Sequence, residues 1–208
     1  MKFVGLKGFC RYSDSKAFDL NEINKMDNVA VALNRVKEAD EIEEVCKKIK
    51  HETVILNEIA AIRNVSKFKK VVASVGLTPL NNEDIKFLKE LGAFAAVIPP
   101  ELNSEIDSFD KSLKLEVFGL ATVEMFYKGK CILSAYFSNK SVKRQGVCRK
   151  ECSRKWDVLY NGSKIAEITF KPEMRSFNVN GDFVKYEGRQ FNKYGVIEDG
   201  INHKRSKS

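Results

Sequence analysis

Histidine is scarce in this chain, and its scarcity narrows the chemistry open to the protein. The sequence has two histidines, His51 and His203, and neither stands in an HExxH motif. Zinc proteases with that motif need two histidines one helical turn apart, and cysteine proteases need a histidine beside the thiol. His51 opens an expected strand, and His203 lies in a basic tail. The sequence therefore offers poor candidates for histidine-dependent proteolysis.

Long apolar runs are also missing. No stretch approaches the roughly 20 residues that a membrane-spanning helix needs. Residues 1–6 are strand-like and are interrupted at once by Lys7 and Gly8, which is untypical of a signal peptide. We therefore expect a cytoplasmic protein, in which the five cysteines are reduced, buried or bound to metal rather than paired in disulfides.

Positive charge is in excess, with a formal net charge of +8. An anionic partner is compatible with this balance, although many basic proteins bind nothing acidic. The excess is concentrated in residues 139–155, which hold seven cations against one acid, Glu151. Tyr136, Phe137 and Trp156 flank this stretch. Basic residues near aromatic rings can hold phosphates and stack a base. The equally weighted alternative is a solvated loop whose cations balance a metal centre. The candidate substrate-binding residues are Lys143, Arg144, Arg149 and Trp156.

Apolar strand-like runs alternate with amphipathic helical segments along most of the chain. We expect strands at residues 3–6, 28–33, 53–56, 70–75, 93–98 and 115–120, and helices at 20–26, 38–50, 57–64, 81–92 and 101–109. Such alternation predicts parallel βαβ units. About six strands are too few for the eight of a closed barrel. The expected fold class is α/β, with an incomplete (β/α) barrel-like parallel core.

The pattern changes after Trp156. Residues 157–170 and 177–186 alternate in polarity around Asn161-Gly162 and Asn180-Gly181, which are favoured turn pairs of β-hairpins. We therefore expect an α/β core at residues 1–156 that carries the cysteine cluster, a β-hairpin extension at 157–202 and a disordered basic tail at 203–208.

Three of the five cysteines, Cys131, Cys148 and Cys152, fall close together in the sequence. Thiolates in such a group bind a soft metal more often than they pack a core. Cys10 is the best fourth ligand, because it and Cys131 both follow expected strands, and sites in parallel α/β folds gather at the carboxyl ends of strands. Cys46 is a rival, although it lies on the apolar face of an expected helix. Glu124 could instead supply an oxygen ligand.

The same stretch resembles the signature region of the collagenase-like peptidase family U32. The similarity rests on Glu116-Val117-Phe118, Gly129-Lys130-Cys131, Ser134 and the run from Gly146 through Cys148 to Cys152. KELGAFAAVIPPELNSEI at residues 89–106 and VKYEGR at 184–189 resemble further family segments. Two departures stand out. Glu124 occupies the place of the family's first cysteine, and Gly119-Leu120-Ala121 replaces its usual histidine.

The resemblance carries implications for fold, cofactor and partners. Loss of the first cysteine resembles the ubiquinone-biosynthesis branch, UbiV, in which an early cysteine supplies the missing ligand. The resemblance thus implies a [4Fe-4S] cluster on Cys10, Cys131, Cys148 and Cys152, with zinc as the alternative. It also implies a short member that lacks the family's first strand and helix. A second U32-family protein could cover the exposed sheet, or the C-terminal hairpins could fold back over it.

The function that the resemblance implies is redox chemistry rather than proteolysis. The better-understood relatives act in oxygen-independent hydroxylation of a quinone precursor or of bases in tRNA and ribosomal RNA, with prephenate as the implied oxygen donor. We predict an iron–sulfur protein of this kind, acting alone or as a subunit. The alternatives are a collagenase-like peptidase and a non-catalytic RNA-binding module. No residue is identified as catalytic.

Overall fold

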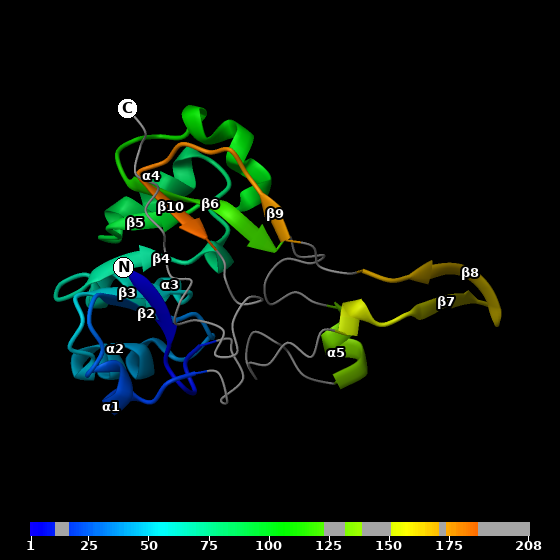
Figure 1. The fold of residues 1–208 in the computed structure, drawn as a ribbon, viewed down its shortest axis with the longest axis horizontal. Helices are drawn as coiled ribbons and strands as arrows, with labels where there is room; N and C mark the ends of the chain where they lie inside the picture. The colour runs from blue at the N-terminus through cyan, green and yellow to red at the C-terminus, as the bar shows by residue number, and fades with distance from the viewer. Residues whose placement is uncertain (11–16, 123–131, 139–150, 171–173, 187–208) are drawn as a thin grey trace.

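The computed structural model describes residues 1–10, 17–122, 132–138, 151–170 and 174–186 (Figure 1). Its centre is a curled sheet of seven parallel strands in the order β1-β2-β3-β4-β5-β6-β10. The strands are β1 (Lys2–Gly5), β2 (Val29–Leu33), β3 (Thr53–Leu56), β4 (Lys70–Ala73), β5 (Ala95–Val97), β6 (Lys114–Thr122) and β10 (Phe183–Tyr186). The sheet curls far enough for Lys185 on β10 to lie over the ring of Phe3 on β1. The expected incomplete barrel with a parallel α/β core is confirmed.

The helices between the strands are α1 (Leu20–Ile23), α2 (Ala39–Lys48), α3 (Ile59–Val65), α4 (Asn82–Glu90), η2 (Val75–Leu77) and η3 (Pro100–Ser108). All five expected helical segments are present, but the segment near 101–109 forms the 3₁₀ helix η3 rather than an α-helix. Asn103, Ser104, Asp107 and Ser108 lie in it. Such short polar side chains compete with helical backbone bonds, as Ser108 does by donating to the Glu105 carbonyl.

The two faces of the sheet have different neighbours. One face packs against α2, α3 and α4 through residues such as Val31, Val54, Val71 and Leu115. The opposite face lines the inside of the curl with Phe3, Ala30, Ala32, Ile55, Val72, Ala95, Val97 and Phe118. Both faces are covered, which explains why β2 and β3 are buried at every position and, apart from Thr53, are apolar throughout. Among the described residues no helix is long and apolar enough to cross a membrane.

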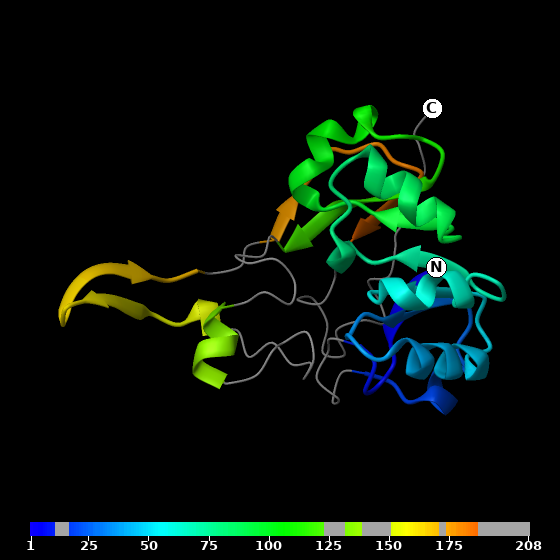
Figure 2. The same cartoon turned by 180° about the vertical axis from the view of Figure 1, so that it is seen from behind.

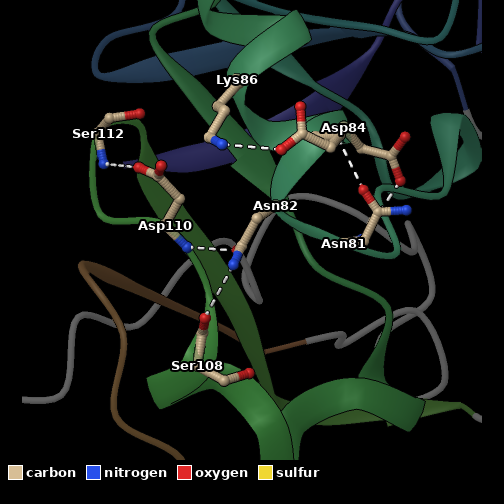
Figure 3. A network of polar contacts seen from close by, with 8 residues as sticks. Asn81, Asn82, Asp84, Lys86, Ser108, Asp110 and Ser112 are labelled. Carbon is tan, nitrogen blue, oxygen red and sulfur yellow. Dashed lines mark hydrogen bonds and ion pairs between the residues drawn. The ribbon is translucent and has the colours of Figure 1, made fainter.

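The amino end of α4 is fixed by a polar network that also holds the approach to β6 (Figure 3). Asn81 caps the helix: its side chain accepts from the Asp84 amide at 3.0 Å, and the Asp84 carboxylate accepts from the Asn81 amide in return. The next residue, Asn82, accepts from the Asp110 amide at 2.7 Å and donates to the Ser108 carbonyl. The first turn of α4 therefore sets where β6 begins.

Asn81→Ala is expected to lower the free energy of unfolding by about 1 kcal/mol, because it leaves an amide of the first helical turn without its cap. Urea unfolding followed by circular dichroism measures the change. Asn81→Ser, which keeps a capping oxygen, serves as the matched control and should unfold close to the wild type. Equal losses in both variants would show that the cap is not the cause.

The C-terminal segments confirm one hairpin and correct the other. Strands β7 (Trp156–Tyr160) and β8 (Ser163–Ile168) pair antiparallel around Asn161-Gly162, whose φ values of 47° and 79° suit a tight hairpin turn. This hairpin extends away from the sheet (Figures 1 and 2). The expected hairpin at residues 177–186 is wrong, because β9 (Met174–Ser176) and β10 both pair with β6 instead.

The reason for this difference is the length of β6. It is nine residues long, whereas β5 is three, so β6 presents a long edge whose backbone groups need partners. Asn180 and Gly181 lack the positive φ of a tight hairpin turn. Asp182 instead accepts a hydrogen bond from the Leu115 amide at 2.9 Å and fixes β10 beside β6. The expected tail at 203–208 lies outside the described residues.

Candidate functional site

Cys10 follows β1 at the carboxyl end of the sheet, where the sequence placed it. Its side chain is buried, and its amide donates to the Leu6 carbonyl at 2.9 Å. Arg35, just after β2, holds the same loop through its amide to Phe9 and its guanidinium to the Gly8 carbonyl at 3.2 Å. The Cys10 thiol is therefore held in a defined position by two neighbouring strand ends.

Of the other three proposed cysteine ligands, the structure describes only Cys152. Cys152 is half-buried in the short helix η4 (Glu151–Ser153), and its carbonyl accepts from the Phe170 amide at 2.9 Å. Cys131, Cys148 and the alternative ligand Glu124 lie outside the described residues. Among the residues that are described, no group of three or more His, Cys, Asp or Glu side chains is placed to hold a metal ion. The four-cysteine set therefore stays a prediction.

Cys46, the rival ligand, is fully buried on α2 among the residues that pack that helix onto the sheet. Burial raises the pKa of its thiol to about 12, against a smaller lowering by Lys69. Metal ligation requires the thiolate, and a thiol with so high a pKa remains protonated near neutral pH. These features fit the interpretation of Cys46 as a structural core residue.

Two buried polar residues at the carboxyl edge were not singled out from the sequence. Asn57 and Ser74 directly follow β3 and β4, and the Ser74 amide extends the ladder by donating to the Leu56 carbonyl at 2.8 Å. Asn57 Oδ1 is buried and accepts no hydrogen bond from any described group. A Cβ on Gly76 would clash with that oxygen, so a larger residue there would force the Asn57 side chain to move. A polar residue directly after an apolar strand was the available signal.

The sequence also left unpredicted a contact between two segments that resemble family motifs. Because β6 and β10 pair in parallel, Val184 lies beside Val117 and Lys185 beside Phe118. Lys185 Nζ lies 3.2 Å from Glu116 Oε1, with side chains 19% and 3% exposed. The same Nζ lies 4.0 Å from the Phe3 ring centroid and 5.5 Å from that of Phe118. The Glu-Val-Phe segment and residues 184–186 of the VKYEGR motif therefore meet inside the curl.

Of the four candidate substrate-binding residues, the structure describes only Trp156. Lys143, Arg144 and Arg149 lie outside the described residues, and Trp156 begins β7. Trp156 stacks on Phe137 of α5 (Ile132–Ser138) with ring centroids 3.7 Å apart and planes at 15°. Its Nε1 donates to the Glu151 carbonyl at 2.6 Å. One face of the Trp156 ring is thus already occupied within the protein.

Curated relatives match only part of the chain. It is 32% identical over 88 residues to tRNA hydroxylation protein P of Haemophilus influenzae, which is 40% of this chain and 18% of that protein. It is 29% identical over 89 residues to tRNA hydroxylation protein P of Escherichia coli strain K12, which is 41% of this chain and 19% of that protein. The matched segment thus spans less than a fifth of these relatives.

Comparison with solved structures and family models gives two further matches. The solved structure of the U32 peptidase Mk0906 superimposes with a TM-score of 0.48 and 12% identity, covering 58% of this chain and 61% of that one. The model of the family described as Peptidase family U32 matches residues 10–192. That range takes in most of the sequence and both of the motif segments that meet at Glu116 and Lys185, and the chain therefore belongs to peptidase family U32.

Proposed function

We propose that this chain is an iron–sulfur protein that acts in the oxygen-independent hydroxylation of a tRNA base. The observation that carries the proposal is the similarity of an 88-residue segment to a tRNA hydroxylation protein, within a chain of the U32 family. This chain matches less than a fifth of the length of those relatives, and the proposal assigns their named activity to it. The first experiment therefore asks whether tRNA is the substrate.

The proposed cofactor is a [4Fe-4S] cluster held by Cys10, Cys131, Cys148 and Cys152, with zinc as the alternative. Cys10 supports this assignment, since a buried thiol at the carboxyl ends of parallel strands stands where such folds place their sites. Cysteine sulfur is the donor that iron–sulfur clusters prefer. A bound cluster would supply one-electron transfer.

The proposed substrate is tRNA rather than a quinone precursor. The names of the matched relatives favour tRNA, and the net charge of +8 favours an anionic partner. Lys143, Arg144 and Arg149 are proposed to contact its phosphates. Hydroxylation of a quinone precursor, as in the UbiV branch, is the second candidate, and a non-catalytic RNA-binding module would share the charge but modify nothing.

A peptidase activity has less support from the described residues. His51 precedes β3 at the amino end of the sheet, and its Nε2 lies 2.8 Å from the Ile23 carbonyl oxygen. Cys10 stands at the opposite, carboxyl end. A thiol–imidazole pair between these two residues would need them at the same end of the strands.

A second U32-family protein is proposed as a partner in the reaction. The edge of β6 away from β5 is not the place for it, because β10 of the same chain pairs along that edge. At the other edge, β1 is followed by a single parallel bridge between Leu6 and Phe18. A tagged pull-down from anaerobic cells that recovers a U32-family relative would support the partner.

Mass spectrometry of nucleosides from a deletion strain tests the function. The expected result is the loss of a hydroxylated nucleoside from tRNA, restored by the intact gene and not by a Cys148→Ser variant. Ribosomal RNA and quinones from the same strain are the internal comparison. Loss of a hydroxyl from quinones alone would transfer the proposal to the quinone precursor. No change in any of the three, with metal-independent cleavage of denatured collagen by the purified protein, would establish the peptidase instead.

A further inference from the structure

We infer that Tyr136 is a base-stacking residue, which holds an unpaired base of an RNA on an exposed aromatic face formed by Tyr136, Phe137 and Trp156. The inference deepens the proposed function and rests on it for the identity of the RNA. The sequence pointed to Trp156 as the aromatic contact. The structure gives Trp156 a supporting position and leaves Tyr136 as the ring that faces solvent.

The aromatic face is built in layers. Trp156 is anchored by its Nε1 hydrogen bond to the Glu151 carbonyl. Phe137 stacks on it, and Tyr136 meets Phe137 edge to face with centroids 5.0 Å apart and planes at 88°. Tyr136 is 82% exposed and Phe137 44% exposed. Trp156 and Phe137 thus form a supported base, and Tyr136 beside them presents a largely open π-face on which a base can stack.

Exposure of this degree is unusual for a large aromatic side chain on a packed helix. A tyrosine needs only its hydroxyl in water and normally buries the rest of its ring. Among the exposed large hydrophobic side chains in the described part of the chain, Tyr136 has the highest exposed fraction. The packing of the described residues around α5 and the hairpin therefore does not account for the position of this ring.

Charge favours a nucleic acid over an apolar protein segment as the occupant. Arg154 and Lys155 directly precede Trp156 and expose 65% and 73% of their side chains. Among the described residues, Arg154 contacts Glu151 at 3.3 Å and Lys155 contacts Glu167 at 3.0 Å. The Lys155 pair is largely exposed and therefore weak, which leaves Lys155 able to contact a phosphate, whereas the buried Glu151 carboxylate keeps Arg154 beside it. The chain as a whole carries +8.

The aromatic face also adjoins a proposed cluster ligand. α5 packs against η4, the helix that contains Cys152. The Trp156 indole is bonded to Glu151, the residue directly before that cysteine. A base stacked on Tyr136 would therefore be held by the same structural unit that presents Cys152. This arrangement would bring a nucleotide substrate toward the redox centre.

The test measures binding of a fluorescently labelled, unstructured oligouridine to the anaerobically purified full chain by anisotropy. Tyr136→Ala is expected to weaken binding about tenfold, the effect of losing one stacked base. Tyr136→Phe keeps the ring face and should bind like the wild type. Quenching of Trp156, the sole tryptophan of the chain, gives a second readout in the wild type and in Tyr136→Phe.

Two controls separate stacking from charge and from folding. Phe87→Ala removes another exposed aromatic ring, 49% exposed on α4, and should leave RNA binding unchanged. An abasic strand with the same phosphates should bind wild type and Tyr136→Ala equally. Unchanged circular dichroism of each variant shows that the fold is intact.

The inference is overturned if the wild type does not bind the oligouridine, if Tyr136→Ala binds it as the wild type does, or if the abasic strand suffers the same loss. Unchanged RNA binding with lost co-purification of a protein would assign the aromatic face to a protein partner. The outcome is separable from that of the proposed function. Normal tRNA in the deletion strain contradicts the function, whereas lost modification with undiminished binding by Tyr136→Ala contradicts only the inference.

Discussion

Replacing Cys148 by serine is expected to leave the protein without iron or acid-labile sulfide, whereas the wild type purified anaerobically is expected to contain both and to be brown. A cubane cluster is held chiefly by cysteine thiolates, and a serine oxygen is too hard a ligand to replace the Cys148 thiolate well at neutral pH. Iron and sulfide assays on protein reconstituted under anaerobic conditions measure the loss. The same replacement of Cys10 identifies the fourth ligand, since a cluster that survives it would favour Glu124 or a further group.

Cys46 supplies the matched control for this experiment. Its thiol is as buried as that of a core residue, and burial raises its pKa to about 12, so Cys46→Ala should retain the full content of iron and sulfide. Cys46→Ala should instead lower the free energy of unfolding, because it removes a sulfur atom from the packing between α2 and the sheet. A colourless wild type that holds one zinc and no sulfide after reconstitution would exclude the cluster.

The parallel core was predictable because local pattern and final burial agree there. β2 and β3 are buried at every position, and apolar at all but Thr53, since both of their faces are covered, and helices that bury one stripe separate them. The two ends of helix α4 were predictable because the residues that fix them are close together in the sequence. Asn81 and Asp84 form a cap within one turn, and Gly92 adopts a φ of 90° just after it.

The C-terminal strands were not predictable in this way, because their partner lies far away in the sequence. Asn180-Gly181 has the composition of a hairpin turn, and local chemistry alone favours pairing of the residues around it. The long edge of β6 competes for the same backbone groups and prevails, with Asp182 bonded to Leu115 across the junction. Only the arrangement of the whole sheet shows that β6 has an edge to offer.

In the candidate site too, features that depend on neighbouring residues were predictable, and contacts between residues far apart in the sequence were not. Cys10 was placed correctly because it directly follows a strand. The contact between Glu116 and Lys185 could not be placed, because it depends on the parallel register of β6 and β10. The unsatisfied Asn57 was also missed, since a single asparagine after a strand is typical of an ordinary turn.

Replacing Glu116 by glutamine is expected to lower the free energy of unfolding by about 2–3 kcal/mol. Removing one partner of a buried ion pair typically costs about 3–5 kcal/mol, because the other charge stays in a poorly solvated place. Lys185 is 19% exposed and lies between the rings of Phe3 and Phe118, which lowers the expected cost. Urea unfolding followed by circular dichroism measures the change, with Glu83→Gln, in an exposed pair with Lys86, as a control within about 0.5 kcal/mol of the wild type.

The double variant Glu116→Gln/Lys185→Met separates the charge effect from loss of contact. The Glu116 oxygen that faces Lys185 lacks hydrogen-bond geometry with any described group, so the attraction between the two side chains is largely Coulombic. Removing both charges should therefore recover most of the stability lost in the single variant. Since Lys185 lies on β10, the single variant should also lose amide-exchange protection first in β10 and its pairing segment of β6. A double variant no more stable than Glu116→Gln, with β10 protected in both, would show that the pair does not hold the last strand to the sheet.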